Sequence, residues 1–341
     1  MKIAVVASPV TPLRPAQLGG AQALVSDIAA ALAARGHDIT LHCAEGSEVR
    51  GVRLATVPAP RDAAAALVMP GGAEPPSAPG VAAALEAMFA AIPDDVDVIS
   101  QHAFDAPAFE LARGRSVLHT LHLPPIVASV VDAARRVGPA HLATVSQAAK
   151  RTWSDAGVGV GVILPNGVPD YAPADHDVEH VALVAGRISP EKGVEHALAA
   201  ARSAGLRVRL AGAHYDPSYA PDLGGVEVLG SLPRSELRRV MSGSAVTICA
   251  VRWDEPFGMV AAEAQMAGCP VAAYRRGAMV EVVEDGVSGR LAEPDDVASL
   301  ARAINQCLDL DRAAVRASAL RRLTLEAAVD RYEVALARVR R

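Results

Sequence analysis

Residues 165–186 read PNGVPDYAPADHDVEHVALVAG, and this stretch divides the chain into two halves of similar size. It opens with the turn-forming run Pro165–Asp170 and stays polar as far as His180. Val181–Ala185 is then a short apolar run, typical of a strand buried on both faces, and Gly186 ends it. A polar, turn-rich segment followed by a new buried strand predicts a linker between two folding units.

Short β-branched runs alternate with alanine-rich helical stretches on both sides of this linker. A first strand is predicted at Lys2–Ala7, and a helix from Ala21 to about Arg35 ends before Gly36, where a helix-terminating glycine belongs. This alternation is typical of parallel sheets covered by helices. Further strands are predicted at 38–43, 52–57, 96–100, 116–121, 141–145 and 160–164, then at 207–211, 226–229, 245–250 and 270–273, and the last two helices at about 312–322 and 325–339.

These elements predict an α/β fold of two doubly wound, Rossmann-like domains that face a central cleft. The chain has 341 residues, of which 51% are hydrophobic, so it can bury two cores. Ligands of such sheets bind beyond the carboxyl ends of the strands, which makes the cleft the expected site. The segment from Pro58 to Gly80 lacks a clear period and is predicted to be a long surface loop.

Composition excludes several classes of protein. The formal net charge of −5 does not suit a nucleic-acid partner, so none is expected. The four cysteines form no C-x-x-C pair, which argues against a zinc site and fits reduced thiols. The apolar run before Pro9 is too short for a secretory signal, and no apolar stretch approaches the roughly 18 residues of a membrane span. We therefore expect a cytoplasmic protein.

The run Asp254–Glu263 reads DEPFGMVAAE and follows a predicted buried strand. Pro256 stands where a helix can begin, so the free backbone N–H groups around residues 257–259 could bind an anion. Glu263 would lie about two turns into this helix, where its carboxylate could accept hydrogen bonds from paired hydroxyls. The same spacing also fits a solvated helix face, and that alternative stays open.

The run Gly186–Gly193 reads GRISPEKG and places two cations around a Ser-Pro turn. Arg187 could hold a diphosphate with its guanidinium fork and Lys192 could hold it as a point charge. Alternatively, Ser189 caps a helix and both cations are solvated.

The paired glycines Gly19-Gly20 precede the first predicted helix. They are not part of a G-x-G-x-x-G motif, so a dinucleotide site is not supported. Glycines still allow a ligand to approach the backbone closely, and a helix start favours a phosphate or carboxylate.

Histidines gather in the first half of the chain, at His102, His119 and His122. Strand alternation puts His119 on one face and His122 on the other, with His122 at the end of the strand. His122 could act as a general acid or base, or it could be a structural hydrogen-bonding group. The sequence has no G-x-S-x-G, Walker or H-E-x-x-H motif, so hydrolase, kinase and metalloprotease chemistry lack their usual residues.

Taken together and in order, these features resemble the retaining glycosyltransferases of family 4, which have the GT-B fold. The resemblance covers nearly the whole chain. It is carried by Gly19-Gly20, His122, Thr144-Val145-Ser146, Pro165-Asn166-Gly167-Val168, Gly186-Arg187 with Lys192, and Glu255-Pro256-Phe257-Gly258 followed by Glu263.

The resemblance implies an enzyme that transfers a sugar from a nucleotide diphosphate sugar to a hydroxyl with retention of configuration. The expected donor is a UDP-sugar, and the departing phosphate helps to accept the proton of the attacking hydroxyl in a front-face mechanism. No metal or other cofactor is expected. The resemblance also implies an acceptor-side domain at 1–168, a nucleotide-sugar domain at 169–324, and a last helix at 325–341 that crosses back onto the first domain.

The resemblance gives roles to particular residues. It implies that Arg187 and Lys192 hold the donor diphosphate and stabilise its charge as it leaves. It implies that Glu255 binds hydroxyls of the donor sugar, beside the backbone of Phe257, Gly258 and Met259. Glu263 would bind the ribose of the nucleotide. Gly20 would lie near the phosphate, and His122 would contact the donor sugar.

Two positions depart from the family pattern. Leu123 follows His122, and Gln22 follows the paired glycines, where acidic residues are common. Both positions concern the donor sugar and the acceptor, so they affect specificity more than activity. The acidic, charge-poor composition favours a small soluble acceptor, although Arg135-Arg136 and the terminal arginines Arg338, Arg340 and Arg341 leave membrane contact open. A nucleotide-sugar epimerase of the same fold and a non-catalytic nucleotide-sugar-binding protein are the alternative functions.

Overall fold

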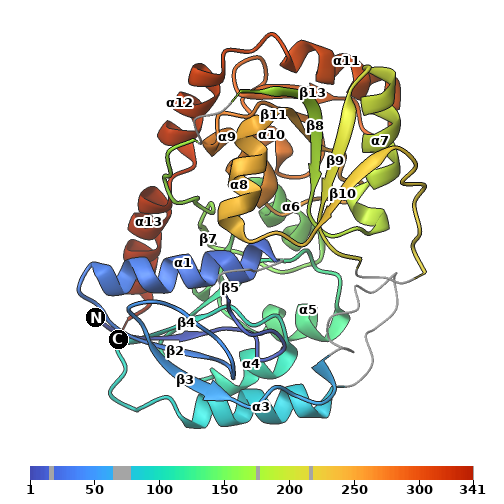
Figure 1. The fold of residues 1–341 in the computed structure, drawn as a ribbon. Coiled ribbons are helices and arrows are strands. Elements are labelled where there is room, and N and C mark those ends of the chain that lie inside the picture. The colour runs from blue at the N-terminus through green and yellow to red at the C-terminus, as the bar shows by residue number, and fades with distance from the viewer. Residues whose placement is uncertain (15–18, 64–77, 174–176, 215–217, 341) are drawn as a thin grey trace. The chain divides into compact units, whose positions relative to one another are not determined.

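The computed structural model describes residues 1–14, 19–63, 78–173, 177–214 and 218–340. The chain forms two compact units, each built on its own parallel sheet (Figure 1). The first unit comprises Met1–Pro15, Ala21–Pro165 and Ala328–Arg341, and the second comprises Ala16–Gly20 and Asn166–Ala327. The predicted α/β class is confirmed. Of the loop predicted at 58–80, residues 64–77 lie outside the described residues.

The first unit contains a seven-stranded sheet in the order β3-β2-β1-β4-β5-β6-β7. The central strands β1 and β4 are neighbours, with Ile3 opposite Val98 and Val6 opposite Gln101. The order changes direction at this pair, which is where a doubly wound sheet places its ligand. The strand bounds are β1 Lys2–Val6, β2 Asp38–Ala44, β3 Arg53–Val57, β4 Val98–Gln101, β5 Val117–Leu121, β6 Leu142–Thr144 and β7 Val162–Ile163.

Helices cover the sheet of the first unit because each presents an apolar stripe to it. Leu85 and Met88 of α3 are fully buried against Ile99 of β4 and its neighbours. Ser146 caps α6, since its side chain accepts a hydrogen bond from the backbone N–H of Ala149 at 2.9 Å. The helices are α1 Gly20–Ala34, α3 Pro79–Ala90, α4 Ala106–Leu111, α5 Ala128–Arg135, α6 Gln147–Asp155 and α13 Leu325–Val339, with a 3₁₀ turn η1 at Pro139–His141.

The last helix, α13, packs on the first unit through both apolar and charged contacts. Tyr332 is fully buried, with its ring 6.0 Å from that of His102. The next residue, Glu333, pairs with Arg35 at 2.5 Å and with His37 at 2.7 Å. The chain therefore returns to its first unit after completing the second.

The second unit contains a six-stranded parallel sheet in the order β10-β9-β8-β11-β12-β13. The order changes direction between β8 and β11, and the central residues of these neighbouring strands are buried and apolar except for Thr247. The strand bounds are β8 Glu179–Ala185, β9 Arg207–Ala211, β10 Val226–Gly230, β11 Ser244–Cys249, β12 Val271–Tyr274 and β13 Gly289–Ala292.

The helices α7 and α11 share one face of this sheet, where Leu198 and Ile304 pack with Val246 and Ile248 in one core (Figure 1). Asp296 caps α11 by accepting a hydrogen bond from the backbone N–H of Ser299 at 2.9 Å. The helices are α7 Val194–Ser203, α8 Arg234–Gly243, α9 Met259–Met266, α10 Met279–Val282, α11 Val297–Cys307 and α12 Arg312–Arg322, with a 3₁₀ turn η2 at Pro190–Lys192.

Gly167 lies where the linker meets the end of the second unit. Val168 exchanges backbone hydrogen bonds with Leu323 at 2.8 Å and Leu325 at 2.9 Å. A Cβ atom at position 167 would lie 2.3 Å from the carbonyl oxygen of Thr324, so only glycine fits. Over the part of the chain that the structure describes, no helix combines the length and apolarity that crossing a bilayer requires.

Candidate functional site

Two of the predicted motifs lie at the carboxyl ends of the central strands of the second unit. Gly186–Gly193 follows β8 and Ala250–Gly258 follows β11, its neighbour in the sheet. The backbone joins the two loops, because the N–H of Arg252 donates to the carbonyl oxygen of Glu191 at 2.8 Å. Gly193 has a positive φ of 62°, and a Cβ atom there would lie 2.0 Å from the carbonyl oxygen of Ala250. The sheet therefore brings both motifs to one edge, where such folds bind ligands.

Lys192 and Glu255 form an ion pair at the centre of this edge. The Lys192 ammonium donates to Oε2 of Glu255 at 2.6 Å, and the indole N–H of Trp253 donates to the same oxygen at 2.6 Å. The ammonium also lies 5.2 Å from the centroid of the Trp253 ring. Burial acts to raise the pKa of Glu255, but Lys192, the Trp253 hydrogen bond and Arg187 together lower that pKa below its usual range. Glu255 is therefore a carboxylate at neutral pH.

Arg187 is held by an acid from its own loop. Its guanidinium lies 3.3 Å from Oε1 of Glu191, and the Ser189 hydroxyl donates to the same oxygen at 2.7 Å. Ser189 does not cap η2 with its side chain, and the side chains of Arg187 and Lys192 are about four-fifths buried. The alternative in which Ser189 caps a helix and both cations are solvated is therefore wrong.

The helix after β11 begins three residues later than expected. Gly258, with a φ of 95°, is the N-cap of α9, and Met259 is its first residue, whereas the sequence indicated a start near Pro256. A glycine in the left-handed region redirects the chain before the helix, so Pro256 and Phe257 belong to the loop. The backbone N–H groups without a partner inside the helix therefore start at Met259. Phe257 precedes the helix, and its apolar side chain is buried.

Glu263 lies one turn into α9 and is buried. The guanidinium of Arg234, at the start of α8, donates to Oε1 of Glu263 through Nη2 at 3.1 Å and through Nε at 3.3 Å. Tyr171 donates its hydroxyl to the backbone carbonyl of Glu263 at 2.6 Å, and Arg238 stacks over the Tyr171 ring. The side chain of Glu263 is 10% exposed, so the alternative of a solvated helix face is wrong.

Arg234, Trp253 and Glu191 belong to this site and were not predicted from the sequence. Arg234 is the first residue of α8, which follows β10. It is 29 residues from Glu263 in the sequence, and the two side chains meet only in the folded unit. Trp253 stands two residues before Glu255 and is one of only two tryptophans in the chain, which is the one sequence feature that singles it out. Glu191 lies inside the predicted cation motif but was given no role there.

His122 follows β5 in the first unit and is buried. Its Nε2 lies 2.9 Å from Nδ1 of His102, which directly follows the neighbouring strand β4. Burial lowers the pKa of His122 to about 4, so the ring is neutral at neutral pH. His119, on the other face of β5, stacks on Phe109 with ring centroids 4.6 Å apart, and burial lowers its pKa to about 3. The predicted alternation of His119 and His122 is confirmed.

The structure thus divides the predicted site residues between the two units. Arg187, Lys192 and Glu255 form one cluster, and Phe257, Gly258 and Met259 lead from it into α9, which carries Glu263. His122 lies in the first unit, and Gly20 is the first residue of α1 and is grouped with the second unit. Within the described ranges no three His, Cys, Asp or Glu side chains gather as metal ligands would.

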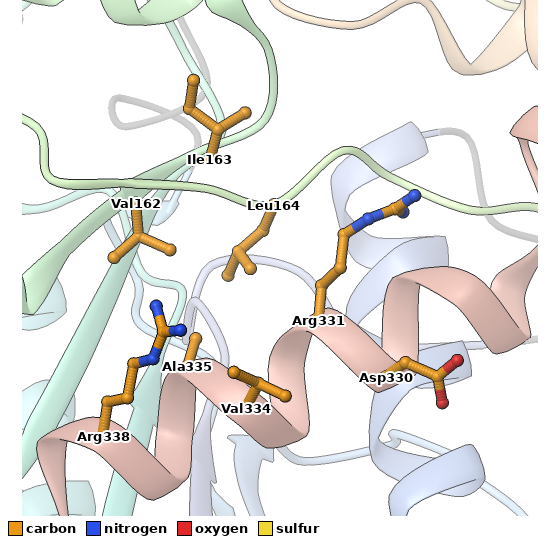
Figure 2. Close-up of a pocket in the computed structure, with 8 residues that line it drawn as sticks. All are labelled: Val162, Ile163, Leu164, Asp330, Arg331, Val334, Ala335 and Arg338. Carbon is orange, nitrogen blue, oxygen red and sulfur yellow. The ribbon is translucent and has the colours of Figure 1, made fainter.

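A groove of about 300 Å³ in the first unit lies apart from these residues. Figure 2 shows it between the strand end at Val162–Leu164 and one side of α13. Val334 and the two arginines Arg331 and Arg338 line the helical side. None of the predicted site residues lines this groove.

Two family models match the chain. The model described as Glycosyltransferase Family 4 matches residues 18–170, and the model described as Glycosyl transferases group 1 matches residues 174–322. The two matches together span most of both units.

Curated relatives match parts of the chain. The D-inositol 3-phosphate glycosyltransferase of Mycolicibacterium smegmatis is 36% identical over 180 residues, which are 48% of this chain and 41% of that protein. A glycogen synthase of Mycobacterium tuberculosis is 32% identical over 167 residues, which are 46% of this chain and 40% of that protein. The matched part of the chain spans about two fifths of the length of each relative.

Solved structures match over nearly the full chain. HepE of Anabaena, in a crystal structure with UDP and glucose, has a TM-score of 0.76 at 21% identity and covers 99% of this chain and 100% of its own. AviGT4, a glycosyltransferase involved in avilamycin A biosynthesis, has a TM-score of 0.74 at 22% identity and covers 99% and 97% of the two chains. At these identities the likeness establishes the shared two-domain fold.

Proposed function

The chain belongs to the glycosyltransferases of family 4 with the GT-B fold, and on this premise we propose that it transfers a sugar from a nucleotide diphosphate sugar to an acceptor hydroxyl. The observation that carries the proposal is the cluster of Arg187, Lys192 and Glu255 beyond β8 and β11. It combines two cations, each about four-fifths buried, with a carboxylate that is held ionised. The cations suit a diphosphate and the carboxylate suits sugar hydroxyls, which is what a nucleotide sugar presents.

Arg187 and Lys192 bind the diphosphate and stabilise the charge that develops as the nucleoside diphosphate leaves. Each cation is already held by a carboxylate, Arg187 by Glu191 and Lys192 by Glu255. These pairings fix both side chains before a ligand arrives, and preorganised charges stabilise a transition state without reorganisation. The positive charge comes from the chain itself, so we propose that transfer proceeds without a metal or other cofactor.

Glu255 and Glu263 bind the two sugar rings of the donor. One oxygen of Glu255 takes hydrogen bonds from Lys192 and Trp253, and its other oxygen can accept hydroxyls of the transferred sugar. Arg234 donates twice to Oε1 of Glu263, so Oε2 can accept the paired hydroxyls of the ribose. The backbone of Phe257, Gly258 and Met259 lies beside Glu255 and leads into α9.

We propose that the reaction retains configuration by front-face attack. The acceptor hydroxyl forms its bond to the anomeric carbon on the face from which the diphosphate leaves, and a phosphate oxygen accepts the hydroxyl proton. His122 contacts the transferred sugar as a neutral ring. Gly20 lies near the phosphate, where a glycine lets the ligand approach the backbone.

The proposed donor is a UDP-sugar, and the proposed acceptor is small and soluble. HepE has been solved with UDP, with UDP-glucose, and with UDP and glucose, which supports UDP as the leaving group here. The name of the Mycolicibacterium smegmatis relative contains D-inositol 3-phosphate, a small polar molecule, which supports a small soluble acceptor here. The name of the other relative, glycogen synthase, specifies a polymer, so polymers belong among the acceptors to be tested.

The test is turnover with purified protein, UDP-sugar donors and a panel of small, polymeric and lipid-linked acceptors. We expect UDP release that depends on a small acceptor, persists in EDTA, and gives a product whose anomeric configuration by NMR is that of the donor. Conversion of the donor without acceptor would instead identify an epimerase. Tight donor binding without turnover on any acceptor would identify a non-catalytic binding protein, and inversion of configuration would contradict the front-face mechanism.

A further inference from the structure

Three buried side chains form a hydrogen-bonded row at the carboxyl ends of β4 and β5. The Ser100 hydroxyl lies 2.9 Å from Nε2 of His102, and Nδ1 of His102 lies 2.9 Å from Nε2 of His122. Gln101 is opposite His119 in the sheet, so Ser100, His102 and His122 all point to the same face. The two rings stack with centroids 5.2 Å apart and an interplanar angle of 20°.

Both imidazoles in this row are neutral at neutral pH. Burial lowers the pKa of His122 to about 4 and, with the neighbouring His122 ring, lowers the pKa of His102 well below its usual value. A neutral imidazole has one N–H donor and one bare nitrogen that accepts. The direction of the first hydrogen bond in the row therefore fixes the direction of the second and the tautomer of His122.

The Ser100 hydroxyl decides between the two directions. Ser100 is 0% exposed, and its contact with His102 is the one hydrogen bond that the described residues give its side chain. If the hydroxyl donates to Nε2 of His102, then Nδ1–H of His102 donates to Nε2 of His122, and His122 carries its proton on Nδ1. The opposite direction would leave the Ser100 hydroxyl proton buried without an acceptor, which is unfavourable.

The other ring nitrogen of His122, Nδ1, is the last polar atom of the row. Its Nδ1 is buried and has no hydrogen-bond partner among the described residues. A buried polar atom without a partner is uncommon in a folded protein and calls for a ligand or a solvent molecule that completes it. With the proton on Nδ1, this atom offers a hydrogen-bond donor, and a sugar hydroxyl oxygen is a matching acceptor.

We propose that Ser100 and His102 are positioning residues that hold His122 as the Nδ1–H tautomer, so that His122 donates a hydrogen bond to a hydroxyl of the transferred sugar. The sugar contact rests on the proposed function, whereas the tautomer rests on the row itself. A wrong histidine tautomer can disable a site whose geometry is otherwise intact. Neither positioning residue touches the sugar.

The test compares His102→Asn with His102→Leu, two replacements with the same branched shape and the same number of side-chain heavy atoms. The asparagine amide can place an N–H where Nδ1–H of His102 stood, and leucine cannot donate. The first readout is the ¹⁵N chemical shift of each His122 ring nitrogen in ¹⁵N-histidine-labelled protein without substrate, assigned by difference from His122→Gln. We expect Nδ1–H in the wild type and in His102→Asn, and a shift of the proton toward Nε2 in His102→Leu.

The second readout is kcat and KM with the nucleotide-sugar donor. We expect kcat to fall at least about tenfold in His102→Leu and to recover to within about threefold of the wild type in His102→Asn. Circular dichroism checks the fold of each variant. Ser100→Ala removes the hydroxyl that sets the direction of the row, so it should give a mixture of His122 tautomers. This variant replaces His102→Leu in the test if His102→Leu does not fold.

Nε2–H on His122 in the wild type would overturn the proposal, as would Nδ1–H persisting in both His102→Leu and Ser100→Ala. The expected ¹⁵N pattern in a protein without transferase activity on any donor would uphold the tautomer assignment and reject the sugar contact together with the proposed function. Equal kcat values in His102→Asn and His102→Leu, with the tautomer shifted, would show that the positioning has no effect on the reaction.

Discussion

Lys192 supplies the positive charge that balances the carboxylate of Glu255 in the candidate site. It makes a hydrogen-bonded ion pair with Glu255 and lies over the ring of Trp253. Its removal would leave a carboxylate buried without its counter-charge, so the effect of a substitution extends beyond one lost contact with a ligand.

Lys192→Met should keep the length of the side chain while removing its charge. We expect kcat to fall by about 100-fold to 1,000-fold, since one preorganised charge contributes about 2.7–4 kcal/mol to transition-state stabilisation. Steady-state kinetics with the nucleotide-sugar donor measure this loss. Lys150→Met, in α6 of the first unit, is the matched control, and an equal loss in both variants would refute the role of Lys192.

The lowered pKa of Glu255 predicts how stability depends on pH. A carboxyl group whose pKa is lower in the folded state contributes stability above its unfolded pKa of about 4.3, and the contribution is lost as the pH falls through the folded value. Glu255→Gln removes this dependence. The free energy of unfolding in urea should therefore fall more between about pH 6 and about pH 3 in the wild type than in Glu255→Gln. Parallel curves for the two proteins would show that the ion pair does not form in solution.

Arg234 is a binding-site residue that the structure adds to those predicted from the sequence. Arg234→Leu should weaken binding of the nucleoside diphosphate about tenfold, because Glu263 loses its partner and its orientation. Arg239→Leu is the matched control on the same helix, since Arg239 is 62% exposed and lies 3.9 Å from Glu236. Calorimetric titration distinguishes the two, and unchanged affinity in Arg234→Leu would place the ribose elsewhere.

At the scale of elements, most strands and helices could be predicted because local sequence marks them. Short apolar, β-branched runs mark the strands, and alanine-rich stretches mark the helices. The last two helices were expected at about 312–322 and 325–339 and run Arg312–Arg322 and Leu325–Val339. The strand β13 was missed, because its sequence GRLA is short and lacks β-branched residues, and it forms by pairing with β12. The start of α9 was misplaced, since Gly258 rather than Pro256 sets it.

Gly193 lies where the backbone after β8 passes close to the backbone after β11. Gly193→Ala should destabilise the protein by about 3 kcal/mol or more, because the new Cβ atom would meet the backbone carbonyl of Ala250, which side-chain movement cannot relieve. Gly205→Ala is the control, since Gly205 has a φ of 75° and nothing within 4 Å of its Cβ position. We expect about 1 kcal/mol for Gly205→Ala from backbone strain alone. Equal losses in urea unfolding would contradict the close approach.

At the scale of the whole molecule, the order of the motifs along the chain made the family and the fold predictable. The restart of the strand pattern after Asp170 gave two doubly wound halves, and the structure has two parallel sheets of that type. The pairings within the site were beyond prediction. Arg234 and Glu263 meet only when α8 and α9 pack together, and Glu191 meets Arg187 only when the segment after β8 folds. The row of Ser100, His102 and His122 likewise depends on the register between β4 and β5.

The central claim is that a nucleoside diphosphate binds beyond β8 and β11 of the second unit. Calorimetric titration of UDP, GDP, ADP and dTDP into the wild type and Glu263→Ala tests it most directly. The account predicts that UDP binds the wild type most tightly and that Glu263→Ala loses at least about tenfold in affinity, the loss of hydrogen bonds to a charged group. No binding by any of the four diphosphates, or equal affinity in the wild type and Glu263→Ala, would contradict it.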